Sequence, residues 1–128
     1  MQLLLDTHLL LWVSEDSPRL SSDARKLVGD TANDVSFSVA SLWEVAIKSM
    51  RGRKDFDVNA ADLRLTLLEN GFRETPILAQ HVLYTSRLPA FHKDPFDRLL
   101  IAQALEEGLT LLTADAVVAS YSAAFVRV

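Results

Sequence analysis

The sequence predicts an α/β fold in which a parallel β-sheet is covered by helices on both faces. Short apolar runs of strand length alternate with longer helical segments along the whole chain, which is the pattern of successive β-α units. The runs at 3–5 and 109–113 contain only leucine and threonine, as expected of strands that are buried on both faces. The length of 128 residues fits one domain, 1–128, with a sizeable core.

The N-terminal third is expected to contain a strand, two helices and a second strand. The apolar run at 3–5 leads directly into a helix that carries the apolar residues 9–13, with Asp6 at the junction. A second helix fits 21–28, and a second strand fits 35–37. This order places Asp6 where the first strand ends.

The middle of the chain is expected to be mainly helical. Ser38 can cap a helix from Val39 to about Met50, which is apolar on most of its sides and therefore expected to be largely buried. Asn59 can cap a further helix at 60–69. The two elements that follow are a short strand and a helical segment, at 72–75 and 78–86.

The C-terminal third begins with a loop at 88–93 and a helix that Asp94 can cap. Pro95 suits the first helical position, and Gly108 ends the helix. The remaining elements are expected to be a strand, a short helix and an edge strand, at 109–113, 116–120 and 125–128.

The composition limits the classes of protein to which the chain can belong. The formal net charge of −4 and the pI of about 5.3 argue against a dedicated nucleic-acid binder with a basic surface, although acids gathered around a metal would leave the outer surface less negative. The absence of cysteine excludes disulfides and thiolate metal sites. No apolar run reaches the roughly 20 residues of a membrane span, and the N-terminus lacks the features of a signal peptide. We therefore expect a cytoplasmic protein with no membrane association.

Four carboxylates occupy unusual positions relative to the expected sheet. Asp6 follows the first strand, Asp115 comes two residues after the strand at 109–113, and Glu44 lies about two turns into the helix that follows the second strand. Because the carboxyl ends of parallel strands meet at one edge, chain direction brings these three acids to the same edge. Asp97 joins them if its helix starts near that edge, and helical spacing places it on an apolar face.

A divalent metal ion would explain why these acids lie together. Four neighbouring carboxylates repel one another, and a hard cation such as Mg²⁺ or Mn²⁺ relieves the repulsion because it prefers carboxylate and water oxygens. A bound cation can also activate a water molecule for phosphodiester hydrolysis. No Ser-His-Asp set competes, and the glycines at 29, 52, 71 and 108 are too scattered to form a phosphate-binding loop.

The same acids also have structural interpretations. Asp6 and Asp115 each precede an expected helix and can cap it. Asp94 is most simply an N-cap, with Asp97 three residues later in the position of a capping box.

Several other polar residues are weaker candidates. Thr7 and Thr113 lie beside Asp6 and Asp115, where a hydroxyl can fix a carboxylate, contact a metal through water or make an ordinary turn hydrogen bond. The histidines have no metal-ligand spacing and are expected at the surface or in loops; they are His8, His81 and His92.

Basic residues follow Glu44 in the chain. Lys48, Arg51, Arg53 and Lys54 form a tract that suits a solvated helix end and can also bind a nucleic-acid backbone. Lys48 can instead pair with Glu44 at i+4 spacing. Arg98 can contact a phosphate or pair with a nearby acid.

Four segments together resemble the PIN-domain ribonucleases, and more closely the VapC-type toxins of bacterial toxin–antitoxin pairs. They span nearly the whole chain in the order and spacing of that family, and they are LLLDTH at 3–8, SVASLWEV at 38–45, DPFDRLLIAQA at 94–104 and LLTAD at 111–115.

The resemblance implies five parallel strands and endonucleolytic cleavage of RNA by a metal-activated water. It implies that Asp6 and Asp97 anchor Mg²⁺ or Mn²⁺, that Glu44 orients the metal or the water, and that Asp115 is the more variable fourth acid. Ala114 departs from the family pattern, in which an asparagine precedes that acid. Members of the family typically form homodimers and are silenced by a small antitoxin encoded beside them.

Two other functions are compatible with parts of the pattern. Phosphatases of the haloacid-dehalogenase type also place an aspartate after the first strand, but they need a second acid two residues later, where this chain has His8. A non-catalytic PIN-like module that binds RNA or protein commonly lacks one or more of the acids, and all four are present here.

Overall fold

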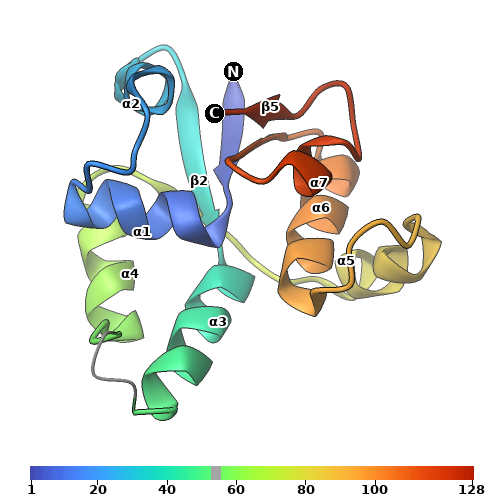
Figure 1. The fold of residues 1–128 in the computed structure, drawn as a ribbon, viewed down its shortest axis with the longest axis horizontal. Coiled ribbons are helices and arrows are strands. Elements are labelled where there is room, and N and C mark those ends of the chain that lie inside the picture. The colour runs from blue at the N-terminus through green and yellow to red at the C-terminus, as the bar shows by residue number, and fades with distance from the viewer. Residues whose placement is uncertain (53–55) are drawn as a thin grey trace.

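A parallel sheet forms the centre of the computed structural model, which describes residues 1–52 and 56–128 (Figure 1). In this described part of the chain, five strands follow one another across the sheet in the order β3-β2-β1-β4-β5. They are β1 (Gln2–Leu5), β2 (Asp34–Ser38), β3 (Arg73–Thr75), β4 (Thr110–Thr113) and β5 (Val126–Arg127). Every neighbouring pair is parallel. The predicted fold class is therefore confirmed.

Helices cover both faces of the sheet. Figure 1 shows α1, α2 and α4 on one side and α5, α6 and α7 on the other. The helical elements are α1 (Thr7–Glu15), α2 (Ser22–Gly29), α3 (Val39–Met50), α4 (Ala60–Glu69), α5 (Ala79–Tyr84), the 3₁₀ turn η1 (Thr85–Arg87), α6 (Pro95–Glu107) and α7 (Ala116–Ala119). The helical segment expected at 78–86 is thus divided into α5 and η1.

The core is split by the sheet into two apolar clusters. Leu3 and Leu5 of β1 pack with residues of α1, α2 and α4, whereas Leu4 packs on the opposite face with residues of α6. All three leucines are completely buried. Successive side chains of a strand point to opposite faces, so a strand between two helical layers must be apolar at every position.

The strand register brings the predicted acids to one edge. Leu5 pairs with Leu112, so the next residues, Asp6 and Thr113, lie side by side at the carboxyl ends of β1 and β4. The backbone N–H of Asp6 donates to the carbonyl of Leu112 at 3.1 Å and fixes this junction. The carboxyl edge of the sheet is consequently where these predicted site residues lie.

The helix expected to be largely buried at 39–50 is buried or partly buried at every residue except Trp43 and Met50. Figure 1 shows α3 extending past the end of β2, away from the faces of the sheet. Trp43 is 56% exposed and Met50 is 85% exposed. Trp43 packs edge-on against Phe96 of α6, with ring centroids 5.0 Å apart.

Among the helices of residues 1–52 and 56–128, none has both the length and the apolar character needed to cross a membrane.

Candidate functional site

Asp6 has a structural role and a position suited to catalysis at the same time. Its Oδ1 accepts a hydrogen bond from the backbone N–H of Leu9 at 2.9 Å and so caps α1. Its Oδ2 accepts a hydrogen bond from the hydroxyl of Thr113. Burial raises the pKa of the Asp6 carboxyl above its ordinary value, while the hydrogen bonds from Thr113 and Leu9 act in the opposite direction. The carboxylate is therefore rigidly held and costly to keep charged unless a cation approaches.

Glu44 presents a buried oxygen with no hydrogen-bond partner in the part of the chain that the structure describes. Its Oε2 lies 3.0 Å from the Nζ atom of Lys48, as expected for i+4 spacing, and its side chain is only 9% exposed. The other oxygen, Oε1, is completely buried. An unpaired carboxylate oxygen is unfavourable in such a place, and a cation would supply the missing partner.

The start of α6 brings Asp97 to the same edge. Asp94 caps the helix as predicted, because its Oδ1 accepts from the backbone N–H groups of Phe96 at 2.8 Å and Asp97 at 3.1 Å. Burial, together with the charges of Asp94, Glu44 and Asp6, raises the pKa of Asp97 to about 6, even though His92 acts in the opposite direction. Asp97 is thus near enough to Glu44 and Asp6 to sense both carboxylates.

Asp115 caps the short helix α7. Its Oδ1 accepts from the backbone N–H groups of Val117 at 2.7 Å and Val118 at 3.2 Å. Its own N–H donates to the hydroxyl oxygen of Thr113 at 3.0 Å, so Thr113 links Asp115 to Asp6. The hydroxyl of Thr113 thus fixes the Asp6 carboxylate, which is one of the roles that the sequence allowed for it.

His92 belongs to the site, although the sequence suggested only a surface or loop histidine. Its Nε2 lies 2.8 Å from Oδ2 of Asp97 and 3.8 Å from Oδ2 of Asp115. The 2.8 Å approach lacks hydrogen-bond geometry, so the buried Nε2 has no partner among the described residues. His92, Asp97 and Asp115 each offer an atom with metal-ligand chemistry, and these atoms lie within 4.8 Å of one another.

The position of His92 is set by contacts that the sequence does not reveal. Its backbone N–H donates to the hydroxyl of Tyr121 at 2.8 Å, and its Nδ1 accepts from the N–H of Asp94 at 3.3 Å. The only sequence signal is a histidine two residues before a capping aspartate.

The other two histidines are not part of the cluster that His92 forms with Asp97 and Asp115. His8 is exposed, as expected, and lies near Trp12 with ring centroids 6.2 Å apart. His81 is 1% exposed, so its expected surface or loop position is wrong. Burial is tolerated because Nδ1 accepts from the N–H of Leu78 at 3.0 Å and Nε2 lies 2.8 Å from Oε1 of Glu107.

Buried hydroxyl contacts fix the helices that carry the acids. Thr7 donates to the hydroxyl of Ser41 at 3.0 Å and ties α1 to α3, rather than contacting a carboxylate. Ser38, at the start of α3, donates to the side-chain carbonyl of Gln103 in α6. These contacts position Glu44 and Asp97 relative to Asp6.

The predicted RNA-contacting residues have different surroundings. Arg98 uses its guanidinium to donate to four backbone carbonyls, so it organises the loop before α6 and is a poor candidate for a phosphate contact or an acid pair. The acceptors are the carbonyls of Thr85, Leu88, Pro89 and His92. Lys48 pairs with Glu44, Arg51 is exposed, and Arg53 and Lys54 lie outside the described residues.

The arrangement suits a hard divalent cation. Four carboxylates from four different elements converge, one buried oxygen lacks a partner, and the pKa of Asp6 and Asp97 is raised, so the cluster without a metal favours bound protons. A hollow beside the cluster is lined by Asp6, Ala114 and Asp115 together with His8, Trp12 and Arg19. A substrate can therefore reach the acids from solvent.

Comparisons with known proteins agree with the fold. The sequence matches the family described as "PIN domain" over residues 3–123. A curated relative named ribonuclease VapC22, from Mycobacterium tuberculosis, is 30% identical over 113 residues, which make up 88% of this chain and 85% of that protein.

Solved structures share the fold at low sequence identity. A chain of VapBC2 from Rickettsia felis, crystallised with a DNA fragment from its promoter, has a TM-score of 0.69 and 15% identity, with 100% of this chain and 98% of that chain covered. A chain of VapBC-5 from Mycobacterium tuberculosis, a member of the VapBC family of toxin–antitoxin systems, has a TM-score of 0.62 and 19% identity, with 99% and 98% covered.

Proposed function

Because the chain belongs to the PIN-domain family, we propose that it is a metal-dependent endoribonuclease of the VapC type, formed by a single catalytic domain over residues 1–128. The observation that carries this proposal is the convergence of Asp6, Glu44, Asp97 and Asp115, with the buried Oε1 of Glu44 left without a partner. A module that only binds RNA or protein has no need for this unfavourable cluster.

The proposed cofactor is Mg²⁺ or Mn²⁺, held by the four acids. When bound, the ion lowers the pKa of a water molecule and stabilises charge on the phosphoryl group. Asp6 contributes a carboxylate whose orientation is fixed by Thr113 and Leu9. Glu44 keeps one oxygen on Lys48, and its other oxygen is buried without a partner and so available to the ion.

The proposed biological role is that of the toxin in a type II toxin–antitoxin pair. Similar chains occur in the VapBC complexes named above, and this supports a small cognate antitoxin as partner. The proposal includes an RNA substrate, a homodimer and a cytoplasmic location.

The first test compares purified wild type with Asp97→Asn on a mixed pool of cellular RNA, each with Mn²⁺ or with EDTA. We expect cleavage only by wild type with metal. A matched control is Glu106→Gln, which removes an exposed carboxylate from the same helix about 14 Å away along the helix axis and should retain activity.

Two outcomes would contradict the proposal. Cleavage that survives both EDTA and the substitution would place the activity in a different site or in a contaminant. No cleavage by wild type, after purification under denaturing conditions to remove antitoxin, would favour a non-catalytic binding module.

A further inference from the structure

We propose that the pocket between α1 and α3 binds a nucleotide of the RNA strand next to the scissile phosphate, with its base against Trp12 and its phosphate on Arg19 and Arg51. This inference rests on the proposed function, because it extends the substrate path from the acidic cluster. The pocket has a volume of about 290 Å³, and its walls include His8, Trp12, Glu15, Arg19, Lys48 and Arg51.

The pocket adjoins the hollow beside the acids. His8, Trp12 and Arg19 line both this pocket and the hollow that reaches Asp6 and Asp115. A strand whose scissile phosphate lies at the acids therefore meets Trp12 and Arg19 next.

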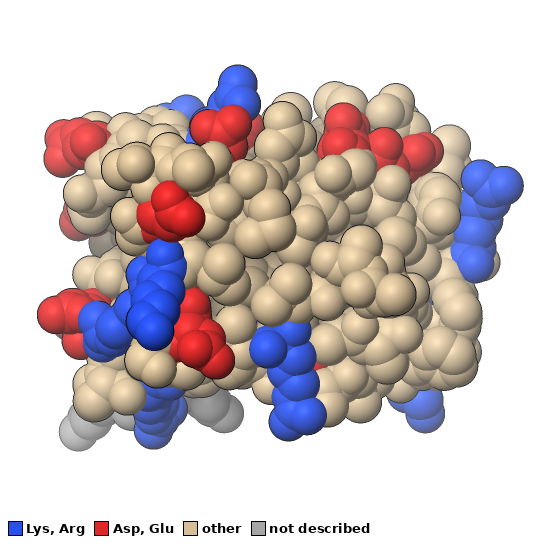
Figure 2. All heavy atoms as spheres, turned by 90° about the horizontal axis from the view of Figure 1, so that it is seen from above, with Lys and Arg blue, Asp and Glu red and all other residues tan. Residues whose placement is uncertain are grey.

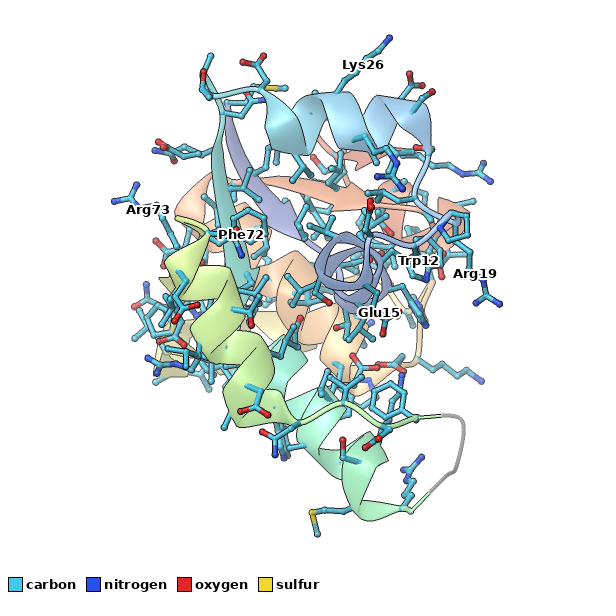
Figure 3. All side chains as sticks on the ribbon, turned by 90° about the vertical axis from the view of Figure 1, so that its left-hand side faces the viewer. Trp12, Glu15, Arg19, Lys26, Phe72 and Arg73 are labelled. Atoms are coloured by element: carbon cyan, nitrogen blue, oxygen red, sulfur yellow. The ribbon has the colours of Figure 1, made fainter. Side chains whose placement is uncertain are left out.

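The chemistry of the walls fits a single-stranded nucleotide. Trp12 is partly exposed and offers an aromatic surface, and stacking on such a surface tolerates any base. Figure 3 shows Trp12, Glu15 and Arg19 gathered at the end of α1 and in the loop that follows it. Arg19 and Arg51 are exposed and make no ion pair within the residues that the structure describes, so both are available to a phosphate.

Positive charge is dispersed on another face of the molecule. Figure 2 shows the face where β1 and β2 begin, on which Lys and Arg side chains are spread among acidic and uncharged ones. In a chain with a net charge of −4, the two arginines of the pocket therefore support the binding of a phosphate beside the acidic cluster. Glu15 is the opposing charge in the pocket, and its carboxylate should weaken RNA binding.

The test measures binding without cleavage, on the Asp97→Asn background in EDTA. The probe is a fluorescein-labelled, mixed-sequence single-stranded RNA of about 12 nucleotides, followed by anisotropy at several salt concentrations. We expect Arg19→Gln and Arg51→Gln each to weaken binding at least about fivefold and to lower the salt dependence by about 0.7 of a counterion. Glu15→Gln should strengthen binding.

Trp12 has a readout of its own. In a Trp43→Phe protein, Trp12 is the remaining tryptophan, so RNA stacking on it should change the intrinsic fluorescence. Lys26→Gln and Arg73→Gln are matched controls, because Figure 3 shows both side chains away from Trp12 and both residues are exposed. These controls should bind RNA within about twofold of the parent.

The results separate this inference from the proposed nuclease activity. The pocket is rejected if RNA does not bind, or if RNA binds but neither the Arg19 and Arg51 variants nor the Trp12 fluorescence respond. If wild type cleaves RNA while the pocket variants bind RNA as tightly as their parent, the nuclease activity is supported and the pocket is rejected. If the pocket variants lose RNA binding but wild type never cleaves RNA, the pocket is supported and the nuclease activity is rejected.

Discussion

Individual carboxylates in this protein serve both the fold and the site. Asp6 and Asp115 each use Oδ1 to cap a helix, and each has its other oxygen facing a residue of the cluster. The capping role that the sequence suggested for both residues is therefore confirmed, and it does not exclude the proposed metal-binding role. Substitutions at these residues must be tested for stability as well as for activity.

Asp97 should destabilise the metal-free protein at neutral pH. Its pKa rises from the ordinary value of 3.8 to about 6, so the folded state binds a proton more tightly than the unfolded chain. The free energy of unfolding, and with it the stability of the fold, should therefore fall as the pH rises from about 4 to about 6. We expect Asp97→Asn in EDTA at pH 7 to be more stable than wild type, by at most about 3 kcal/mol.

Urea unfolding at pH 4 and pH 7 measures this effect. The difference in unfolding free energy between Asp97→Asn and wild type should be small at pH 4 and larger at pH 7. The difference between Glu106→Gln and wild type should not depend on pH. A difference independent of pH would argue that Asp97 does not carry this repulsion.

Asp94 should contribute to stability through its cap. Asp94→Ala removes the acceptor of two backbone N–H groups and should cost about 0.5–2 kcal/mol of unfolding free energy. Asp94→Asn is the matched control, because asparagine can also cap, and it should recover most of the loss. Full stability of Asp94→Ala combined with lost cleavage would instead place Asp94 in the active site.

At the scale of elements, the loop before α6 depends on one guanidinium. Arg98 reaches the carbonyls of Thr85, Leu88, Pro89 and His92, and a lysine ammonium cannot span these acceptors in the same way. We expect Arg98→Lys to speed amide hydrogen exchange in residues 85–94 and to weaken Mn²⁺ binding, because this loop leads directly into the start of α6, which carries Asp97. Arg73→Lys is the control, and unchanged exchange in Arg98→Lys would contradict this role.

The elements themselves were largely predictable from the sequence. The apolar run of Leu3, Leu4 and Leu5 predicted a strand buried on both faces, and Asp94 with Pro95 predicted the start of α6. The exposure of Trp43 in α3 was not predictable from the apolar residues of that helix, because it depends on where the helix lies relative to the sheet.

The site was predictable where chain direction determines position. Acids directly after β1 and β4 must lie at the carboxyl edge, and this identified Asp6 and Asp115. The position of His92 in the candidate site was not predicted, because its loop is held by Arg98 and Tyr121. These contacts leave no local pattern in the sequence. The proximity of Trp12 and Arg19 to the acids was not predicted either, because the pocket that they line forms only when α1 packs beside α3.

At the scale of the whole molecule, metal binding should stabilise the fold. An ion that binds only the folded state adds about 2.7 kcal/mol at a concentration 100 times its Kd. We expect Mn²⁺ to raise the Tm of wild type and of Glu106→Gln, and EDTA to reverse the rise. Asp97→Asn should show little response, and an equal response in all three proteins would contradict binding at the acidic cluster.

The hydrogen bond between Thr113 and Asp6 joins residues 107 positions apart in the chain. During synthesis, a growing chain that already contains Asp6 and Glu44 still lacks Asp97 and Asp115, which come from its last elements. Translation must therefore pass Asp115 before the four acids can assemble. The order of synthesis therefore prevents the proposed metal site from assembling before nearly all of this sequence has been translated.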